Sequence, residues 1–205
     1  MNPYHTNTAL LVVGLQTDLL PGGAMEVPGS DKLISSVNQL MEWYEHVLAA
    51  KFSLPADHLL FAANHPWRKP GQLVKIGSVD VPLEIMFCVK GSFGEEFTPG
   101  LHSDRFEFVA EMGAEPDAIP HSAFFDTGNP RSTGLKEYLI QNQITELHLC
   151  GVPLETTLWN TARDALNMNM TVKVIAEASL CREEEKCPEV LEWLGARGIL
   201  HKPPK

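Results

Sequence analysis

Runs of consecutive apolar residues alternate along the chain with segments in which apolar residues recur every three or four positions. Continuous apolar runs are typical of strands that are covered on both faces. We expect such strands at residues 8–13, 59–63, 106–110, 147–150 and 171–176. The helical spacing predicts helices at residues 32–50, 134–141, 155–167 and 188–196.

This alternation predicts an α/β fold, a three-layer sandwich with a mainly parallel central sheet and helices on both faces. With 205 residues, of which 44% are apolar, the chain is long enough for one core, so we expect a single domain over residues 1–205. Ligands of such folds bind at the carboxyl ends of the strands. Residues 66–105 contain several Gly and Pro and show little periodicity, so we expect them to pass over this edge.

The charge balance narrows the classes of partner. Lys and Arg together number 16 and Asp and Glu 26, which leaves a formal net charge of −10. An acidic chain without a basic run is unsuited to nucleic acid or to an anionic membrane surface. The sequence has no apolar stretch of the roughly 18 residues that a membrane span needs and no secretory pattern at its start, so we expect a cytoplasmic protein.

The cysteines predict reduced, mostly structural thiols. Cys88, Cys150, Cys181 and Cys187 show no C-x-x-C spacing. Four cysteines in a domain of this size do not indicate a disulfide scaffold. Cys150 ends an apolar run, which favours a small buried side chain at that position.

Several segments carry a resemblance to one family. Residues 9–25 read ALLVVGLQTDLLPGGAM, which resembles the V-D-x-Q-N-D-F-x-P-G-G opening of nicotinamidases and other isochorismatase-like cysteine hydrolases. Further along the chain, FGEEFTP, SAFFDTG and NTARDAL are similar to the family's G-A-E-F-H-P, S-A-F-F-D-N-G and T-A-x-D-A-L segments. Because these segments follow one another in order across nearly the whole chain, the resemblance implies the isochorismatase-like hydrolase fold.

The positions that the resemblance assigns to catalysis hold other residues. The family uses an Asp as general base, a Lys, and a nucleophilic Cys, and the corresponding residues are Gly14, Met112 and Thr157. Glycine cannot accept a proton, methionine carries no charge, and a threonine hydroxyl needs a strong adjacent base. We expect Met112 to fill space, Thr157 to make a local backbone hydrogen bond, and nicotinamidase activity to be absent.

The metal site that the resemblance implies is also altered. Nicotinamidases commonly bind a divalent ion through a D-x-H pair after the second strand and a further His in a P-D-H-C-V-x-G segment. Phe87 stands at that further His, and either Asn64 or His65 falls near the pair. One histidine is a poor ligand set, because a stable site needs three or four donors. We therefore expect no metal and no other cofactor, and a hydrogen-bonded loop role for His65.

The loop around the nucleophile position leads to two further expectations. The family has a cis peptide bond that corresponds to Val152-Pro153, and proline lowers the free-energy cost of the cis form, so we predict a cis bond there. Glu155 would lie at a helix start, where unpaired backbone amides favour a carboxylate. Gln16 and Asp18 are expected to be structural and to fix the loop after the first strand.

Two functions follow from these features, and a general interaction protein with no pocket is a third possibility. The first is a non-catalytic paralogue that binds a small molecule in a vestigial pocket, or a protein partner. Pocket candidates are Gln16, His65, Phe87, His121, Phe124, Val152, Pro153 and Glu155. The second is a divergent hydrolase of a small amide or ester that uses His65, His121, Glu155 or Thr157. A nucleophile and a base within about 3 Å of each other in a concave pocket would favour the hydrolase. A homo-oligomer is implied by the resemblance alone.

Overall fold

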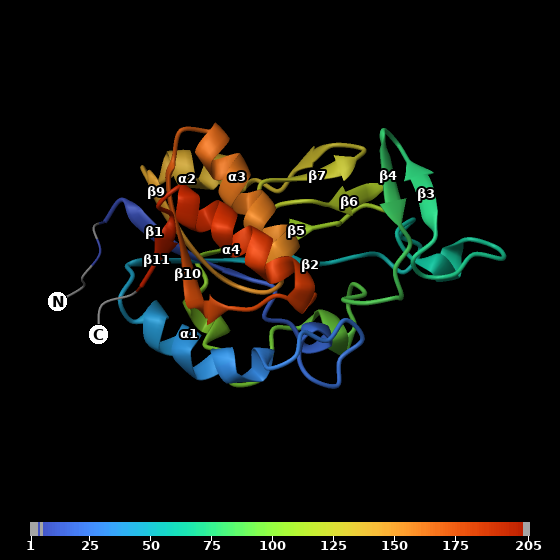
Figure 1. The fold of residues 1–205 in the computed structure, drawn as a ribbon, viewed down its shortest axis with the longest axis horizontal. Coiled ribbons are helices and arrows are strands. Elements are labelled where there is room, and N and C mark those ends of the chain that lie inside the picture. The colour runs from blue at the N-terminus through green and yellow to red at the C-terminus, as the bar shows by residue number, and fades with distance from the viewer. Residues whose placement is uncertain (1–3, 5, 203–205) are drawn as a thin grey trace.

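A parallel sheet forms the centre of the molecule, as the computed structural model shows for residue 4 and residues 6–202 (Figure 1). Within these residues the sheet has six strands in the order β11-β10-β9-β1-β2-β5, and all neighbouring strands pair in parallel. Their bounds are β1 Thr8–Val13, β2 His46–Phe52, β5 Phe108–Met112, β9 Glu146–Gly151, β10 Thr171–Ser179 and β11 Leu200–His201. Every residue of β1 is buried, which confirms the expectation of a strand covered on both faces.

Helices cover the two faces of this sheet. The α-helices of the described residues are α1 Leu33–Met41, α2 Leu135–Gln141, α3 Trp159–Asn167 and α4 Cys187–Ala196. Figure 1 shows α1 on one side of the strands and α3 and α4 together on the other. The rings of Trp159 and Trp193 join α3 to α4, with their centroids 5.9 Å apart. In the described part of the chain, none of these helices has the length and apolar character required to cross a membrane.

Short antiparallel strands lie at the carboxyl end of the central sheet. β3 Leu73–Ile76 and β4 Val79–Pro82 form an antiparallel hairpin, and β6 Ala118–Pro120, β7 Phe125–Gly128 and β8 Arg131–Ser132 form a small antiparallel sheet. Figure 1 shows the β3-β4 hairpin at the far end of the molecule, beyond β6 and β7. The remaining short helical turns are Thr17–Leu19, Ser30–Lys32, Ala62–Asn64, Phe93–Glu95, Ser103–Arg105, Glu184–Lys186 and the π-helical turn Leu154–Leu158.

The helix predicted over residues 32–50 is wrong in its second half. The helix α1 ends at Met41, and residues 46–52 form β2 between β1 and β5. Val47, Leu48 and Ala49 are all fully buried. Consecutive residues can all be buried in a strand covered on both faces but not on a one-sided amphipathic helix, and this tertiary position overrides the helical spacing of the sequence.

The strand predicted over residues 59–63 is also wrong. This segment is a turn followed by the helical turn Ala62–Asn64, while β5 occupies the place beside β2. Asn64 closes the loop, because its Nδ2 donates hydrogen bonds to the carbonyl oxygens of Ala56 and His58. Leu60, Phe61 and Ala62 are buried, which explains the apolar run, but they are buried by this loop and not by pairing in the central sheet.

The expectation that all four cysteines are reduced is wrong for two of them. Cys181 and Cys187 form a disulfide, with their Cα atoms 5.9 Å apart. The chain turns back between the end of β10 and the start of α4, and this turn brings two cysteines six residues apart into bonding distance. Cys88 and Cys150 are free and buried, as expected for structural thiols.

Candidate functional site

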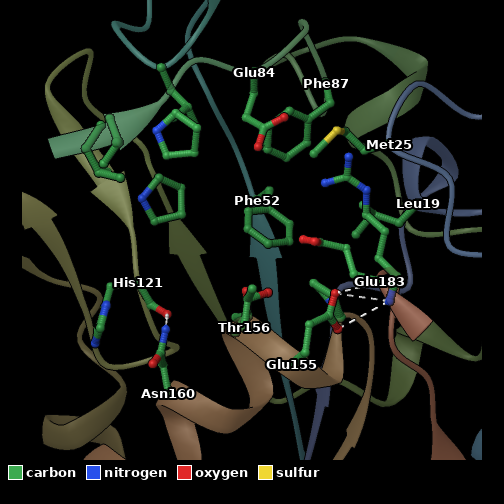
Figure 2. A pocket seen from close by; sticks show the side chains of 18 of the residues that line it. Leu19, Met25, Phe52, Glu84, Phe87, His121, Glu155, Thr156, Asn160 and Glu183 are labelled. Carbon is green, nitrogen blue, oxygen red and sulfur yellow. Dashed lines mark hydrogen bonds between the residues drawn. The ribbon is translucent and has the colours of Figure 1, made fainter. Parts of the chain in front are cut away.

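A cavity of about 340 Å³ lies at the carboxyl end of the sheet. It opens beside the ends of β1, β2 and β9, where the parallel fold predicts a binding site. Figure 2 shows Glu84 and Phe87 at one end of the cavity, Glu155 and Thr156 at the opposite end, and Phe52 between them. His121 and Asn160 lie together on one side.

One end of the cavity is apolar. Its wall is formed by the buried side chains Leu19, Met25, Phe52, Leu60, Phe87 and Ile119. The Phe52 and Phe87 rings meet edge to face with centroids 5.5 Å apart, and Phe87 makes a similar contact with Phe61 at 6.0 Å. Such aromatic contacts stabilise a fixed wall, so this end of the cavity is preformed.

The metal-binding positions of the resembled family fall on this apolar wall. The second strand of the fold is β2, so a D-x-H pair directly after it corresponds to Phe52 and Leu54, and Phe87 stands at the third position. All three side chains are buried and none has a donor atom for a metal. Across the described ranges, no group of three or more His, Cys, Asp or Glu side chains is arranged to hold a metal ion. The residues present do not fit a divalent ion.

The earlier assignment of the metal pair to Asn64 or His65 depended on the wrong second strand. His65 Nε2 is 2.7 Å from the carbonyl oxygen of Leu59 and does not line the cavity. The expected loop role of His65 is confirmed. Its expected place in the pocket is not, because His65 is absent from the cavity lining, although Leu60 of the same segment is part of it.

Gly14 follows β1 at a point where the main chain leaves no room for a side chain. Its φ is +66°, and a Cβ atom built on it would lie 2.1 Å from the carbonyl oxygen of Val152. Its N–H donates to the Ala50 carbonyl at 2.9 Å. The backbone geometry at this position therefore accommodates only glycine, and any other residue requires the end of β1 or the Val152 loop to move.

Met112 and Thr157 differ in their relation to the cavity. Met112 ends β5, is fully buried in the core and does not line the cavity, which agrees with the expected space-filling role. Thr157 lies in the π-helical turn and lines the cavity. The hydrogen bond expected from its hydroxyl is not found within the described residues. Its carbonyl oxygen instead accepts a hydrogen bond from Thr161 Oγ1 at 2.7 Å.

The cis Val152-Pro153 bond is present, as predicted. Pro153 lines the cavity, and its carbonyl oxygen accepts a hydrogen bond from the N–H of Leu158, the residue before α3. Val152 is fully buried and does not line the cavity, since its carbonyl faces Gly14. The resembled loop geometry is therefore retained although its nucleophile position holds Thr157.

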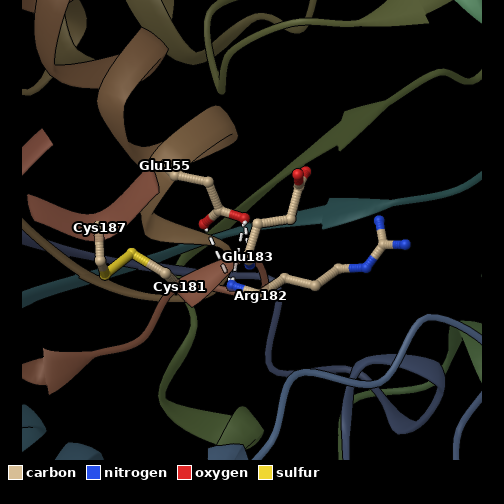
Figure 3. Close-up of a disulfide and its surroundings, with 5 residues drawn as sticks. All are labelled: Glu155, Cys181, Arg182, Glu183 and Cys187. Carbon is tan, nitrogen blue, oxygen red and sulfur yellow. Dashed lines mark hydrogen bonds between the residues drawn. A yellow bond between two sulfur atoms is a disulfide. The ribbon is translucent and has the colours of Figure 1, made fainter. Parts of the chain in front are cut away.

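Glu155 is held by a neighbouring loop and not by its own helix, which corrects the expectation from the sequence. Its carboxylate accepts hydrogen bonds from the backbone N–H groups of Arg182, at 3.1 Å, and of Glu183, at 3.0 Å. Figure 3 shows this pair of contacts beside the Cys181-Cys187 disulfide, which closes the same loop. The Arg182 side chain runs away from Glu155. The Glu155 carboxylate is thus used to fix the loop.

His121 lies at the side of the cavity. Burial lowers the pKa of its imidazole, and the Asp164 carboxylate, 3.7 Å from its Nε2, opposes that shift. Its ring stacks on Phe125 with centroids 5.4 Å apart, and Asn160 Nδ2 donates to its carbonyl oxygen. These contacts position His121, but they do not join it to a nucleophile.

The two remaining pocket candidates lie outside the cavity lining. Gln16 is structural, as expected: its Nε2 donates to the carbonyls of Phe52 and Glu95, and its Oε1 accepts the N–H of Phe52. Asp18 Oδ2 likewise accepts the N–H of Cys88 at 2.7 Å. Phe124 is buried in the core.

The cavity lacks a paired nucleophile and base. Among its described lining residues, no hydrogen bond joins a hydroxyl or thiol to a His, Asp or Glu side chain. The two free thiols are no substitute, because burial raises the pKa of Cys88 strongly and that of Cys150 to about 12. Both therefore stay protonated near neutral pH.

Four charged residues of the cavity were missed from the sequence: Glu84, Arg182, Glu183 and Lys186. The first two are the ones without a side-chain partner among the described residues. Glu84 is fixed by backbone hydrogen bonds to Leu60 and Ala62, and burial raises its pKa while the positive charge of Arg182 opposes that rise. Both side chains line the cavity. They lie in irregular loops that are 98 residues apart in sequence, so no local pattern could have paired them.

The comparisons with known proteins agree with this architecture. The model of the isochorismatase domain matches residues 8–191. A nicotinamidase of Escherichia coli (strain K12) is 35% identical over 181 residues, which cover 85% of this chain and 82% of that protein.

Two solved structures extend the comparison to three dimensions. A nicotinamidase/pyrazinamidase of Acinetobacter baumanii superimposes with a TM-score of 0.89 at 26% identity, covering 97% of this chain and 96% of that one. A pyrazinamidase of Pyrococcus horikoshii in complex with zinc superimposes with a TM-score of 0.78 at 26% identity, and the match covers 96% of this chain and 99% of that one. The chain belongs to the isochorismatase family and is related to nicotinamidases.

Proposed function

We propose that this protein is a non-catalytic member of the isochorismatase family that binds a small molecule in the cavity at the carboxyl end of the sheet. The observation that carries the proposal is the main chain at Gly14. A general base at this position would need a Cβ where the Val152 carbonyl oxygen stands 2.1 Å away. Replacing one side chain would therefore not restore the base, because the backbone around position 14 would also have to move.

The other positions support the same proposal. Met112 offers no charge to stabilise an oxyanion, and Thr157 has no base beside it. Phe52, Leu54 and Phe87 replace metal ligands with hydrocarbon. A cavity of about 340 Å³ with an apolar end and a few polar groups still has the character of a ligand site, since such sites span about 300–1,000 Å³.

The rearranged hydrolase draws no support from a specific contact. His65 lies outside the cavity, Glu155 is bonded to backbone amides, and His121 faces Asp164. A rearranged site would need a nucleophile and base in contact, and the cavity lining offers no such pair in the described chain.

The test is release of ammonia from nicotinamide and pyrazinamide by the purified protein, with and without a chelator. The expected result is no release above the blank in either condition. A triple variant, Gly14→Asp, Met112→Lys and Thr157→Cys, is the comparison. We expect it to stay inactive as well, because an aspartate at position 14 collides with the main chain. Turnover by the unmodified protein that is lost on chelation would overturn the proposal.

A further inference from the structure

The apolar end of the cavity selects for hydrocarbon. Leu19, Met25, Phe52 and Phe87 are each less than 9% exposed, and the only polar atom on these four side chains is the weakly polar sulfur of Met25, while the Glu84 carboxylate lies beside Phe87 at the same end (Figure 2). A ring nitrogen or amide bound against them would lose its hydrogen bonds to water without gaining new ones. The part of a ligand that enters this end is therefore an aromatic or branched aliphatic group.

Two opposite charges at the cavity are unpaired. The Glu84 carboxylate and the Arg182 guanidinium make no hydrogen bond or ion pair with any described residue, although both line the cavity. The other charged groups there have partners: Glu155 accepts two backbone amides, and Glu183 lies 2.6 Å from Lys186 Nζ. Burial raises the pKa of the Glu84 carboxyl, and the nearby charges of Arg182 and Lys186 oppose that rise while the charge of Glu183 adds to it.

Resting on the proposed binding function, we propose that the cavity takes a small zwitterion with a hydrocarbon side chain, of the class of apolar α-amino acids. Arg182 would hold the carboxylate, because a guanidinium matches a carboxylate through two parallel hydrogen bonds. Glu84 would accept hydrogen bonds from the ammonium group. The hydrocarbon side chain would lie against Phe52 and Phe87.

This assignment accounts for features that a nicotinamide site does not need. A neutral amide has no charge to pair with either Glu84 or Arg182, and its ring nitrogen has no donor at the wall of Phe52 and Phe87. A zwitterion satisfies both charges at once. The Cys181-Cys187 disulfide and the hydrogen bonds that the N–H groups of Arg182 and Glu183 donate to the Glu155 carboxylate fix the backbone of Arg182, which reduces the loss of conformational freedom on binding.

The test is calorimetric titration of the purified protein with four compounds: phenylalanine, 3-phenylpropionate, 2-phenylethylamine and nicotinamide. The two phenyl analogues each lack one charge of phenylalanine. We expect phenylalanine to bind about tenfold or more tightly than either analogue, and nicotinamide to bind most weakly, because a site built to pair a group rejects ligands without it.

Two variants assign the charges. The Glu84→Gln substitution should lower the affinity for phenylalanine about tenfold and leave the affinity for 3-phenylpropionate unchanged. The Arg182→Met substitution should lower the affinity for phenylalanine and leave the affinity for 2-phenylethylamine unchanged. The matched controls are Glu45→Gln and Arg68→Met, which alter exposed charges that do not line the cavity and should change none of the affinities. Thermal melts of all four variants check that the fold is retained.

Equal affinities for phenylalanine and its one-charge analogues would overturn the proposal, as would the absence of binding by all four compounds. Tighter binding of nicotinamide would also overturn it. Ammonia release is measured in the same nicotinamide sample. Its appearance marks failure of the proposed function, whereas loss of charge selectivity without ammonia release marks failure of the zwitterion assignment alone.

Discussion

The buried side chains between the strands and helices differ in kind at the two ends of the parallel sheet. Toward the amino ends of the strands, His148 is fully buried and bonded on both nitrogens, to Tyr44 Oη at 2.5 Å and to Glu146 Oε1 at 2.8 Å. Lys173 Nζ completes the cluster at 2.8 Å from Glu146. At the carboxyl ends, the corresponding depth is occupied by Phe52 and Met112.

The amino end of the sheet thus contributes stabilising contacts, whereas the carboxyl end is where ligands of this fold class bind. Buried polar groups at the amino end are satisfied by one another, so each stabilises the others. The positions that the resemblance assigns to the family's reactive groups lie at the carboxyl end, and they hold Gly14, Met112 and Thr157. The sheet, the cis Val152-Pro153 bond and the Gln16 contacts persist without them. On the proposed function, the framework forms without those reactive groups.

The largest predicted effect comes from adding one methyl group at the carboxyl end. Gly14→Ala should lower the free energy of unfolding by about 4 kcal/mol, because the new Cβ meets the Val152 carbonyl oxygen in a backbone conformation that disfavours alanine. Urea denaturation of the variant and the unmodified protein measures this loss.

The control for that substitution is Gly22→Ala. Gly22 also has a positive φ, of +88°, but nothing lies within 4 Å of a Cβ there. Only the conformational cost applies, about 1–2 kcal/mol. If Gly14→Ala proved no more destabilising than Gly22→Ala, the close approach of Val152 to Gly14 would be disproved.

A second prediction concerns pH and the amino end. Burial lowers the pKa of His148 to about 4, from an ordinary value of 6.5, so the unfolded chain binds a proton more readily than the folded protein between these values. Stability should therefore fall as the pH falls from 6.5 to 4, by about 3 kcal/mol in total from this group. The pKa of Glu146 is also lowered, by Lys173 and His148 against the effect of its burial, and adds a loss in the same direction at lower pH.

Unfolding free energies measured at several pH values check this slope. A His148→Leu variant should be less stable at neutral pH, because Tyr44 and Glu146 lose a partner, yet its stability should change less between pH 6.5 and 4. An unchanged slope in this variant would show that the titrating group lies elsewhere.

A smaller effect is expected from the disulfide beside the cavity. Replacing Cys181 and Cys187 with serine should lower the free energy of unfolding by about 2 kcal/mol, since the closed loop is short. The N–H groups of Arg182 and Glu183 should exchange with solvent faster, because their bonds to Glu155 lose support. Amide exchange no faster than in the unmodified protein would mean that Glu155 alone holds the loop.

Sequence patterns predicted the architecture well where burial is uniform. The strands 8–13, 147–150 and 171–176 and the later helices are found, because their neighbours in the fold impose the same burial that the pattern implies. The prediction failed at residues 32–50 and 59–63. Val47 continues the helical spacing of the preceding residues, and only the places of β1 and β5 on either side make its segment a strand.

The candidate site was predictable only where a residue is tied to a motif. Pro153, Phe87 and Gly14 were located through the resemblance, whereas Phe52 was missed because the second strand was placed too late. Glu84 and Arg182 come from irregular loops and meet only in three dimensions. The disulfide was missed because two cysteines six residues apart carry no signal unless the chain turns between them.

The most direct measurement of the central claim is the initial rate of nicotinamide hydrolysis at high protein concentration, with zinc supplied and the Escherichia coli nicotinamidase as a positive control. For the unmodified protein we predict a rate equal to the blank, because Gly14 provides no base and, within the described residues, no hydrogen bond joins the Thr157 hydroxyl to a His, Asp or Glu side chain. A rate above the blank that a Thr157→Val substitution abolishes would contradict the account.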